Sequence, residues 1–164
     1  MKTIVHECRR LAGDSEGKTT MFKRILISTD GSEITAKAVA TAIELARSSG
    51  GQLFAIGVKE PFPYSAISEM QPVPPQEFYD AQERIAAARV KAVTDAAAAA
   101  GVPAQGHTVE ALHPWEAIID HAKTQGCDLI VMASHGRRGV SALLLGSETQ
   151  KVLTHSTLPV LVVR

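Results

Sequence analysis

Short apolar runs alternate along this chain with longer segments in which apolar residues recur every three or four positions. The short runs are rich in Ile, Leu and Val, which is typical of strands buried in a parallel sheet. The longer segments have the period of helices that bury one face. The pattern predicts strands at 24–29, 52–59, 104–110, 128–133 and 158–163, separated by helices that begin near residues 32, 76, 113 and 147.

This order of elements predicts an α/β fold, with five parallel strands and helices on both faces, because right-handed crossovers alternate around a parallel sheet. The strand at 104–110 has the weakest apolar pattern and is expected at a sheet edge. Ser32 or Asp30 is predicted to cap the helix after the first strand. The proline-rich segment 60–75 is predicted to be a long loop, either a lid or partner site or a plain connection.

Composition narrows the class of protein. A chain of 164 residues suits one domain. The 17 basic and 17 acidic side chains balance, so no net field favours nucleic acid or an acidic membrane surface. No apolar run reaches the roughly 18 residues of a membrane span, and no secretory signal opens the chain, so a cytoplasmic location is expected. Residues 1–20 are polar and aperiodic, and they are predicted to form a mobile extension before a domain at 21–164.

The segment after the fourth strand carries the candidate chemistry. Residues 133–147 contain three glycines and two arginines, and Gly146 and Ser147 open the next helix. Free N–H groups and the positive dipole end at a helix start favour an anion, and Ser147 adds a hydroxyl. Glycine at 136 and 146 lets the main chain come close to a ligand. The pattern therefore predicts a phosphate-binding loop, the alternative being a glycine-rich turn without a ligand.

Two common phosphate-binding motifs are excluded. A Walker loop needs a lysine after its last glycine, whereas Ser147 follows Gly146 directly. The dinucleotide fingerprint G-x-G-x-x-G fails because 136–139 reads Gly-Arg-Arg-Gly. A different spacing fits: a small residue, two residues of any kind, Gly, nine residues of any kind, and then Gly-Ser. The residues at these positions are Ala133, Gly136, Gly146 and Ser147. This spacing resembles the signature Gly-x2-Gly-x9-Gly-[Ser/Thr] of the universal stress protein family.

The resemblance extends from Met21 to Arg164, through the opening Ile-Leu-Ile-Ser-Thr-Asp-Gly-Ser at 25–32 and the closing strand at 158–163. It implies the strand order 3-2-1-4-5 of adenine nucleotide alpha hydrolase-like folds. Asp30 and the 133–147 loop would then meet at the switch point, where open α/β sheets bind ligands. It also implies ATP, or else AMP or ADP, with Mg²⁺ held through the phosphates, and a homodimer that covers the edge strand 158–163.

The resemblance also implies a set of nucleotide-binding positions. The base is expected between Val58 and Asp30, the ribose near Ala133, and the phosphates on the loop. Arg137 and Arg138 are expected either to contact phosphate or to face solvent. The full set is Ser28, Thr29, Asp30, Val58, Met132, Ala133, Gly136, Arg137, Arg138, Gly146, Ser147, Glu148 and Thr149, with no catalytic residue and no metal ligand among them.

Ala133 departs from the family pattern, in which this position is glycine. If its methyl group removes one charge-assisted contact, the loss is about 1.5–3 kcal/mol. At about 1.4 kcal/mol per tenfold in affinity, such a loss weakens a micromolar site without abolishing it.

An ATP-binding regulatory stress protein is the expected function. No nucleophile–base pair, Walker lysine or second acidic residue accompanies the loop, so at most slow ATP hydrolysis is expected. The alternatives are a nucleotide-independent family member that acts through its dimer surface, and an adenylating or pyrophosphatase-type enzyme of related architecture. The sequence identifies no downstream protein partner.

Overall fold

The computed structural model describes residues 21–59, 61, 76–136 and 145–164. The predicted extension at 1–20 and nearly all of the predicted loop at 60–75 lie outside these residues. The elements are β1 (Arg24–Ser28), α2 (Glu33–Ser49), β2 (Gln52–Lys59), α3 (Gln76–Ala99), β3 (Ala104–Glu110), α4 (Pro114–Thr124), β4 (Leu129–Ala133), α5 (Ser147–His155) and β5 (Val160–Val163).

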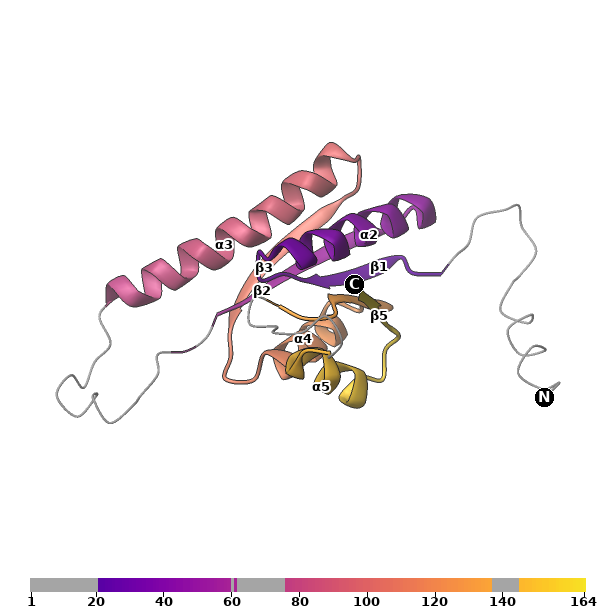
Figure 1. The fold of residues 1–164 in the computed structure, drawn as a ribbon. Helices are drawn as coiled ribbons and strands as arrows, with labels where there is room; N and C mark the ends of the chain where they lie inside the picture. The colour runs from indigo at the N-terminus through magenta and orange to yellow at the C-terminus, as the bar shows by residue number, and fades with distance from the viewer. Residues whose placement is uncertain (1–20, 60, 62–75, 137–144) are drawn as a thin grey trace, which may run out of the picture.

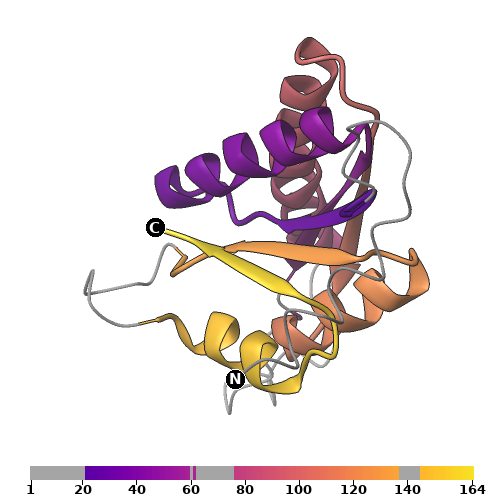
Figure 2. The same ribbon diagram turned by 90° about the vertical axis from the view of Figure 1, so that its right-hand side faces the viewer.

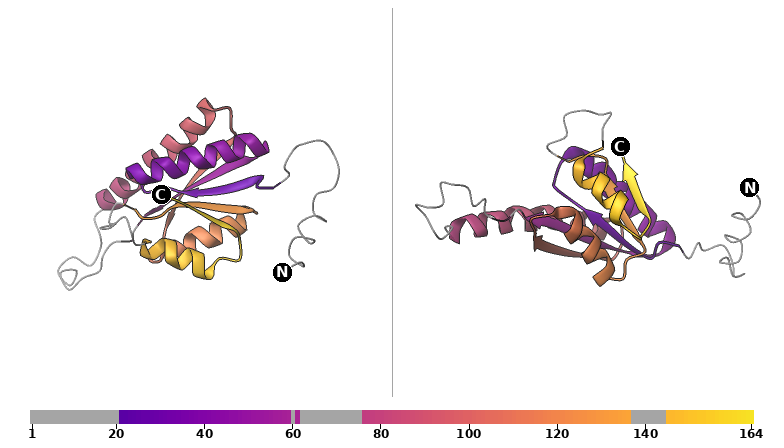
Figure 3. Two further views of the ribbon diagram at one scale, coloured as in Figure 1. Left: turned by 45° about the vertical axis from the view of Figure 1, so that its right-hand side comes forward. Right: turned by 90° about the horizontal axis from the view of Figure 1, so that it is seen from below.

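The strands form one parallel sheet in the order β3-β2-β1-β4-β5 (Figure 1). Helices α2 and α3 cover one face, and α4 and α5 cover the other, which Figure 2 and Figure 3 show from three further directions. The predicted fold class and strand order are therefore confirmed. The order places β1 beside β4, with Ile25 opposite Leu129.

Each face of the sheet has its own apolar core. On the α2 and α3 face, three alanines of α2 at i, i+4 and i+8 are fully buried against the central strands, which brings this helix close to the sheet. On the other face, Phe54 and Ile130 pack with residues of α4 and with Val152 of α5. The three central strands are buried on both sides, as their continuous apolar runs predict.

The ends of several elements are fixed by side chains. Ser32 is the N-cap of α2, and its hydroxyl accepts the N–H of Thr35 at 3.4 Å. Asp128 receives the N–H groups of Lys23 and Arg24 at 2.7 and 3.0 Å, which holds the start of β1 against β4. α4 begins at Pro114, as predicted.

The last strand is shorter than predicted. β5 begins at Val160 rather than at Leu158. The hydroxyl of Ser156 accepts the N–H of Leu158 at 3.0 Å, so the chain is still turning there, and Pro159 has no N–H to donate.

Two histidines meet between β3 and α4. The rings of His107 and His121 have centroids 4.8 Å apart. The Nδ1 atom of His107 and the Nε2 atom of His121 are buried, and neither has a hydrogen-bond partner among the described residues. Burial lowers the pKa of His121, and the neighbouring His107 lowers it further. His121 is thus a packed histidine.

This histidine pair predicts a loss of stability in acid. Since the pKa of His121 is lower in the folded than in the unfolded protein, the unfolded chain takes up the proton first. The free energy of unfolding should therefore be constant above about pH 6.5, the ordinary histidine value, and should fall as the pH drops below it. Urea denaturation at a series of pH values measures this slope. His121→Phe should flatten it, and the exposed control His113→Asn should leave it unchanged.

Cys127 is buried just before β4, and burial raises the pKa of its thiol to about 11. It is therefore a small core residue and not a thiolate at neutral pH. No helix within the described ranges is both long and apolar enough to cross a membrane.

Candidate functional site

The turn that follows β1 is rigidly built around Asp30. One carboxylate oxygen, Oδ1, accepts the N–H of Ser32 at 2.9 Å and the hydroxyl of Thr35 at 2.7 Å. The hydroxyl of Thr29 accepts the N–H of Gly31, which has a φ of 75°. Of the two predicted caps, Ser32 caps α2 and Asp30 braces the turn. The second carboxylate oxygen of Asp30, Oδ2, takes part in neither of these two bonds.

That second oxygen lies against the loop after β4. A Cβ added to Gly136 would lie 2.6 Å from Oδ2 of Asp30, closer than real Cβ atoms approach any atom. Gly136 is itself exposed. The two turns that the sequence predicts to meet at the switch point therefore come together, and a Cβ at position 136 would require the carboxylate of Asp30 or the loop to shift.

The return of the loop to α5 is fixed by main-chain and hydroxyl contacts. The N–H of Gly146 donates to the carbonyl of Ser134 at 2.8 Å, and the buried hydroxyl of Thr149 donates to the carbonyl of Ala133 at 3.0 Å. The N–H of Ser134 donates to the carbonyl of Val163 at 2.7 Å, which ties the start of the loop to β5. Both ends of the loop are thus anchored on strand ends.

The start of α5 faces the same region. The first bond within the helix runs from the N–H of Gln150 to the carbonyl of Gly146 at 2.9 Å. The N–H groups of Ser147, Glu148 and Thr149 precede it and have no partner within the helix. Ser147 is exposed, and the N-cap, Gly146, has no side chain. These three N–H groups and the helix dipole make an anion-binding terminus.

The carboxylate of Glu148 is used for a different purpose. It accepts the N–H of Trp115, in the first turn of α4, at 2.9 Å, and the ammonium of Lys151 at 3.2 Å. The side chain therefore joins α4 to α5. Of the polar groups of Glu148, only the main-chain N–H is therefore available to an anion at the start of α5.

The end of β2 directs main-chain groups toward the same place. In a parallel ladder, the N–H and C=O of one residue face the same neighbouring strand, and successive residues alternate between neighbours. Ile56 faces β1, because its carbonyl accepts the N–H of Thr29 at 3.0 Å. Val58 therefore also faces the side of β1, but β1 has ended at Ser28, opposite Ile56. The N–H and carbonyl of Val58 are directed past the end of β1.

The remaining predicted residues divide into three groups. Ser28 is half-buried at the end of β1. Met132 and Ala133 are buried, and the side chain of Met132 belongs to the core on the α4 face. Arg137 and Arg138 lie outside the described residues.

α3 contributes a residue that the sequence does not single out. A Cβ added to Gly31 would meet Cγ of Arg89 at 2.9 Å and Cδ at 3.1 Å, so this arginine lies across the turn beside Asp30. The sequence around Arg89 does not indicate a role in the site, because α3 is long and rich in charged residues. The position of Arg89 depends on how α3 crosses the sheet. A positive side chain therefore borders the candidate site from α3. No group of three or more His, Cys, Asp or Glu side chains in the described part of the chain is placed to hold a metal ion.

This arrangement defines a class: open parallel α/β proteins in which the turns after two neighbouring strands meet at the switch point of the sheet. The family model of the universal stress protein family matches residues 21–164. A universal stress protein of Thermus aquaticus is 35% identical over 144 residues, which is 88% of this chain and all of that protein. YxiE of Bacillus subtilis is 33% identical over 150 residues, with 88% of this chain and all of YxiE covered.

Among solved structures, that of MJ0577, from Methanocaldococcus jannaschii, is similar, with a TM-score of 0.74. The two chains are 26% identical, and the match covers 87% of this chain and 96% of MJ0577. The chain therefore belongs to the universal stress protein family.

Proposed function

We propose that this protein is an adenine-nucleotide-binding universal stress protein, with ATP as its principal ligand. The observation that carries the proposal is the close contact between the two turns, where a Cβ on Gly136 would lie 2.6 Å from Oδ2 of Asp30. An acidic turn suits a ribose or an amino group, and the N–H groups at the start of α5 suit phosphate. The N–H and carbonyl of Val58 suit the edge of a base.

Related proteins give independent support. Solved structures include a universal stress protein in complex with cAMP, with a TM-score of 0.66 and 24% identity, and one from Archaeoglobus fulgidus in complex with dAMP, with a TM-score of 0.60 and 16% identity. Both ligands carry an adenine base and a phosphate. In the proposed complex, Mg²⁺ is held through the phosphates.

The direct test is to identify the ligand. Mass spectrometry of small molecules released from freshly purified, denatured protein should detect an adenine nucleotide. Titration of the emptied protein with a fluorescent ATP analogue, with and without Mg²⁺, should give saturable binding that unlabelled ATP displaces. An emptied protein that shows no saturable binding would contradict the proposal and favour a nucleotide-independent role.

A regulatory binding protein fits the site better than an efficient hydrolase. Oδ1 of Asp30 is already engaged by the N–H of Ser32 and the hydroxyl of Thr35. The carboxylate of Glu148 is engaged by α4 and Lys151. Neither arrangement places a general base for an attacking water, so the expected rate of ATP hydrolysis is slow.

We also propose a homodimer through the β5 edge. All four residues of β5 are only partly buried, and Ile130 and Ser134 bond to the carbonyls of Pro159 and Val163. By the alternation of a parallel ladder, the N–H and carbonyl of Val162 face the open edge. A second copy that pairs along this edge would satisfy those groups and remove an aggregation hazard.

Val162→Pro tests the dimer. Proline at this position removes the N–H that faces the open edge and leaves every bond to β4 in place. Proline is tolerated at such positions of an edge strand. The variant is expected to sediment as a monomer at micromolar concentration, with the far-UV circular dichroism of the folded protein. Val162→Thr, which keeps the N–H, should remain a dimer. A wild-type protein that is itself monomeric under these conditions would contradict the proposal.

A further inference from the structure

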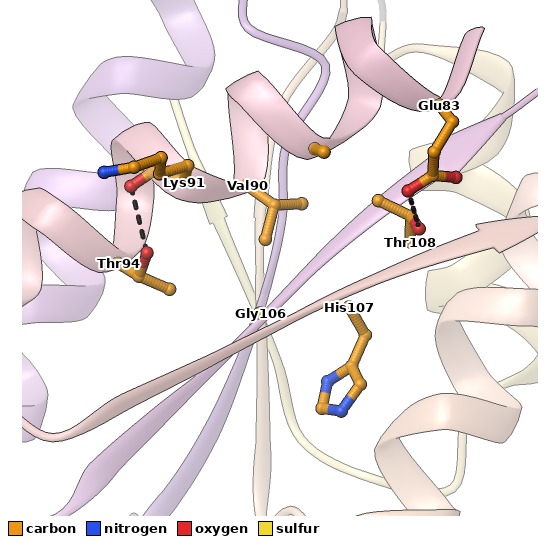
Figure 4. A pocket seen from close by; sticks show the side chains of 8 residues that line it. Glu83, Val90, Lys91, Thr94, Gly106, His107 and Thr108 are labelled. Carbon is orange, nitrogen blue, oxygen red and sulfur yellow. Dashed lines mark hydrogen bonds between the residues drawn. The ribbon is translucent and has the colours of Figure 1, made fainter. Parts of the chain in front are cut away.

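A carboxylate on α3 joins the ends of two strands next to the candidate site. Figure 4 shows Glu83 reaching from α3 to Thr108 on β3. The hydroxyl of Thr108 donates to Oε1 of Glu83 at 2.8 Å, and the ammonium of Lys59, at the end of β2, donates to Oε2 at 2.6 Å. The hydrogen bond from Lys59 and then that from Thr108 lower the pKa of Glu83, so the carboxylate is charged at neutral pH.

This contact differs from an ion pair that lies wholly within α3. The side chains of Lys59 and Glu83 are 18% and 46% exposed, and the two residues lie on different elements. Lys91 and Asp95 pair within α3 at the same distance of 2.6 Å, but their side chains are 72% and 62% exposed. A pair as exposed as the second contributes little to stability. The Glu83 contact instead fixes α3, β2 and β3 relative to one another.

The strand end that Glu83 holds is the one that faces the proposed base. Lys59 directly follows Val58, and its carbonyl accepts the N–H of Ala111 at 3.1 Å. The end of β2 is therefore held by its pairing with β3, in which Lys59 lies opposite Glu110, by the bond to Ala111 and by the ion pair to α3. On the β1 side, no described residue pairs with the N–H or carbonyl of Val58, because β1 has ended.

We propose that Glu83 is a positioning residue for recognition of the base. By holding Lys59 and Thr108, it keeps the N–H and carbonyl of Val58 at the spacing and direction that match a donor and an acceptor on the edge of adenine. The inference rests on the proposed nucleotide-binding function. Glu83 does not itself contact the nucleotide in this arrangement, so it acts on the choice of base and not on binding of the phosphates.

The test compares ATP with inosine triphosphate. The two ligands share the ribose and phosphates, but inosine carries a carbonyl where adenine carries an amino group, which reverses the hydrogen-bonding pattern at that edge. Dissociation constants for both are measured for the wild type, Glu83→Ala, Glu83→Gln and the matched control Asp95→Ala. The wild type should prefer ATP. Glu83→Ala should lose about tenfold of that preference, the worth of about one hydrogen bond to a main-chain group.

The other variants separate positioning from general stability. Glu83→Gln should retain part of the preference, because its amide oxygen still accepts from Lys59, and Asp95→Ala should keep all of it. Hydrogen exchange at the Ala111 amide in the ligand-free protein gives a second readout, expected to be faster in Glu83→Ala than in Asp95→Ala. An unchanged ratio in Glu83→Ala, or an equal loss for both ligands, would overturn the inference. A wild type that binds neither ligand would instead overturn the proposed function, and the inference with it.

Discussion

Gly136→Val is expected to raise the dissociation constant for an adenine nucleotide at least about 100-fold, or about 2.7 kcal/mol. Even the first carbon of a side chain at this position would overlap Oδ2 of Asp30, at 2.6 Å. Valine adds two branches that are stiff about χ1. Either the loop or the Asp30 turn has to move, and Asp30 is held by two hydrogen bonds within its own turn. The loop is therefore expected to move, which displaces the phosphate-binding groups.

Fluorescent-ATP titration measures this effect, and the melting temperature serves as its control. Because Gly136 is exposed, the variant should unfold within a few degrees of the wild type. Ala98→Val adds the same two branches at an exposed position near the end of α3, and this variant should bind as the wild type does. Undiminished binding by Gly136→Val would show that nucleotide binding does not depend on the close contact between the two turns.

Gly106→Val is expected to lower the free energy of unfolding by about 2–3 kcal/mol, as overpacking of a well-packed contact does. A Cβ at this β3 position would lie closer than 3.0 Å to Cγ1 of Val90 and 3.3 Å from Cγ2 of Thr94. Val90 is only 5% exposed, so it has little room to yield. The intrinsic preference of valine for strands offsets only part of this strain, because the whole β-propensity scale spans about 1 kcal/mol.

Urea denaturation of a double-mutant cycle checks the cause. Combining Gly106→Ala with Val90→Ala removes the atoms that collide. The combined loss should therefore be smaller than the sum of the single losses by about 1 kcal/mol or more. Gln105→Val, on the exposed neighbouring residue, should change stability by no more than about 0.5 kcal/mol. Strict additivity in the cycle would mean that the contact with Val90 is not what excludes a side chain at 106.

The sheet and the order of its helices follow from local patterns. The apolar runs at Ile25–Ile27 and Leu129–Met132 are buried on both faces, and no other element of an α/β domain needs such a run. The start of α4 at Pro114 follows from the fixed φ of proline. The spacing between Gly136 and Gly146 placed the loop, and the strand order then placed it beside Asp30.

Contacts between distant side chains could not be predicted in this way. Glu148 is 33 residues from Trp115, whose N–H it accepts, whereas the sequence placed Glu148 only among the nucleotide-binding positions at the start of α5. The contact of Glu83 with Lys59 and that of His107 with His121 depend on the angle at which helices cross the sheet. Periodicity reports which face of a helix is buried, but it does not report that angle.

The hydrogen bond from Ser134 to Val163 has a thermodynamic consequence. It connects the first residue of the phosphate loop to the last residue of β5, so one main-chain bond belongs both to the proposed ligand pocket and to the proposed subunit contact. Linkage between two binding equilibria is reciprocal. If bound nucleotide changes the dimerisation constant by some factor, dimerisation changes the affinity for nucleotide by the same factor. If nucleotide binding and dimerisation are coupled in this way, the ratio of dimer to monomer changes with the concentration of adenine nucleotide.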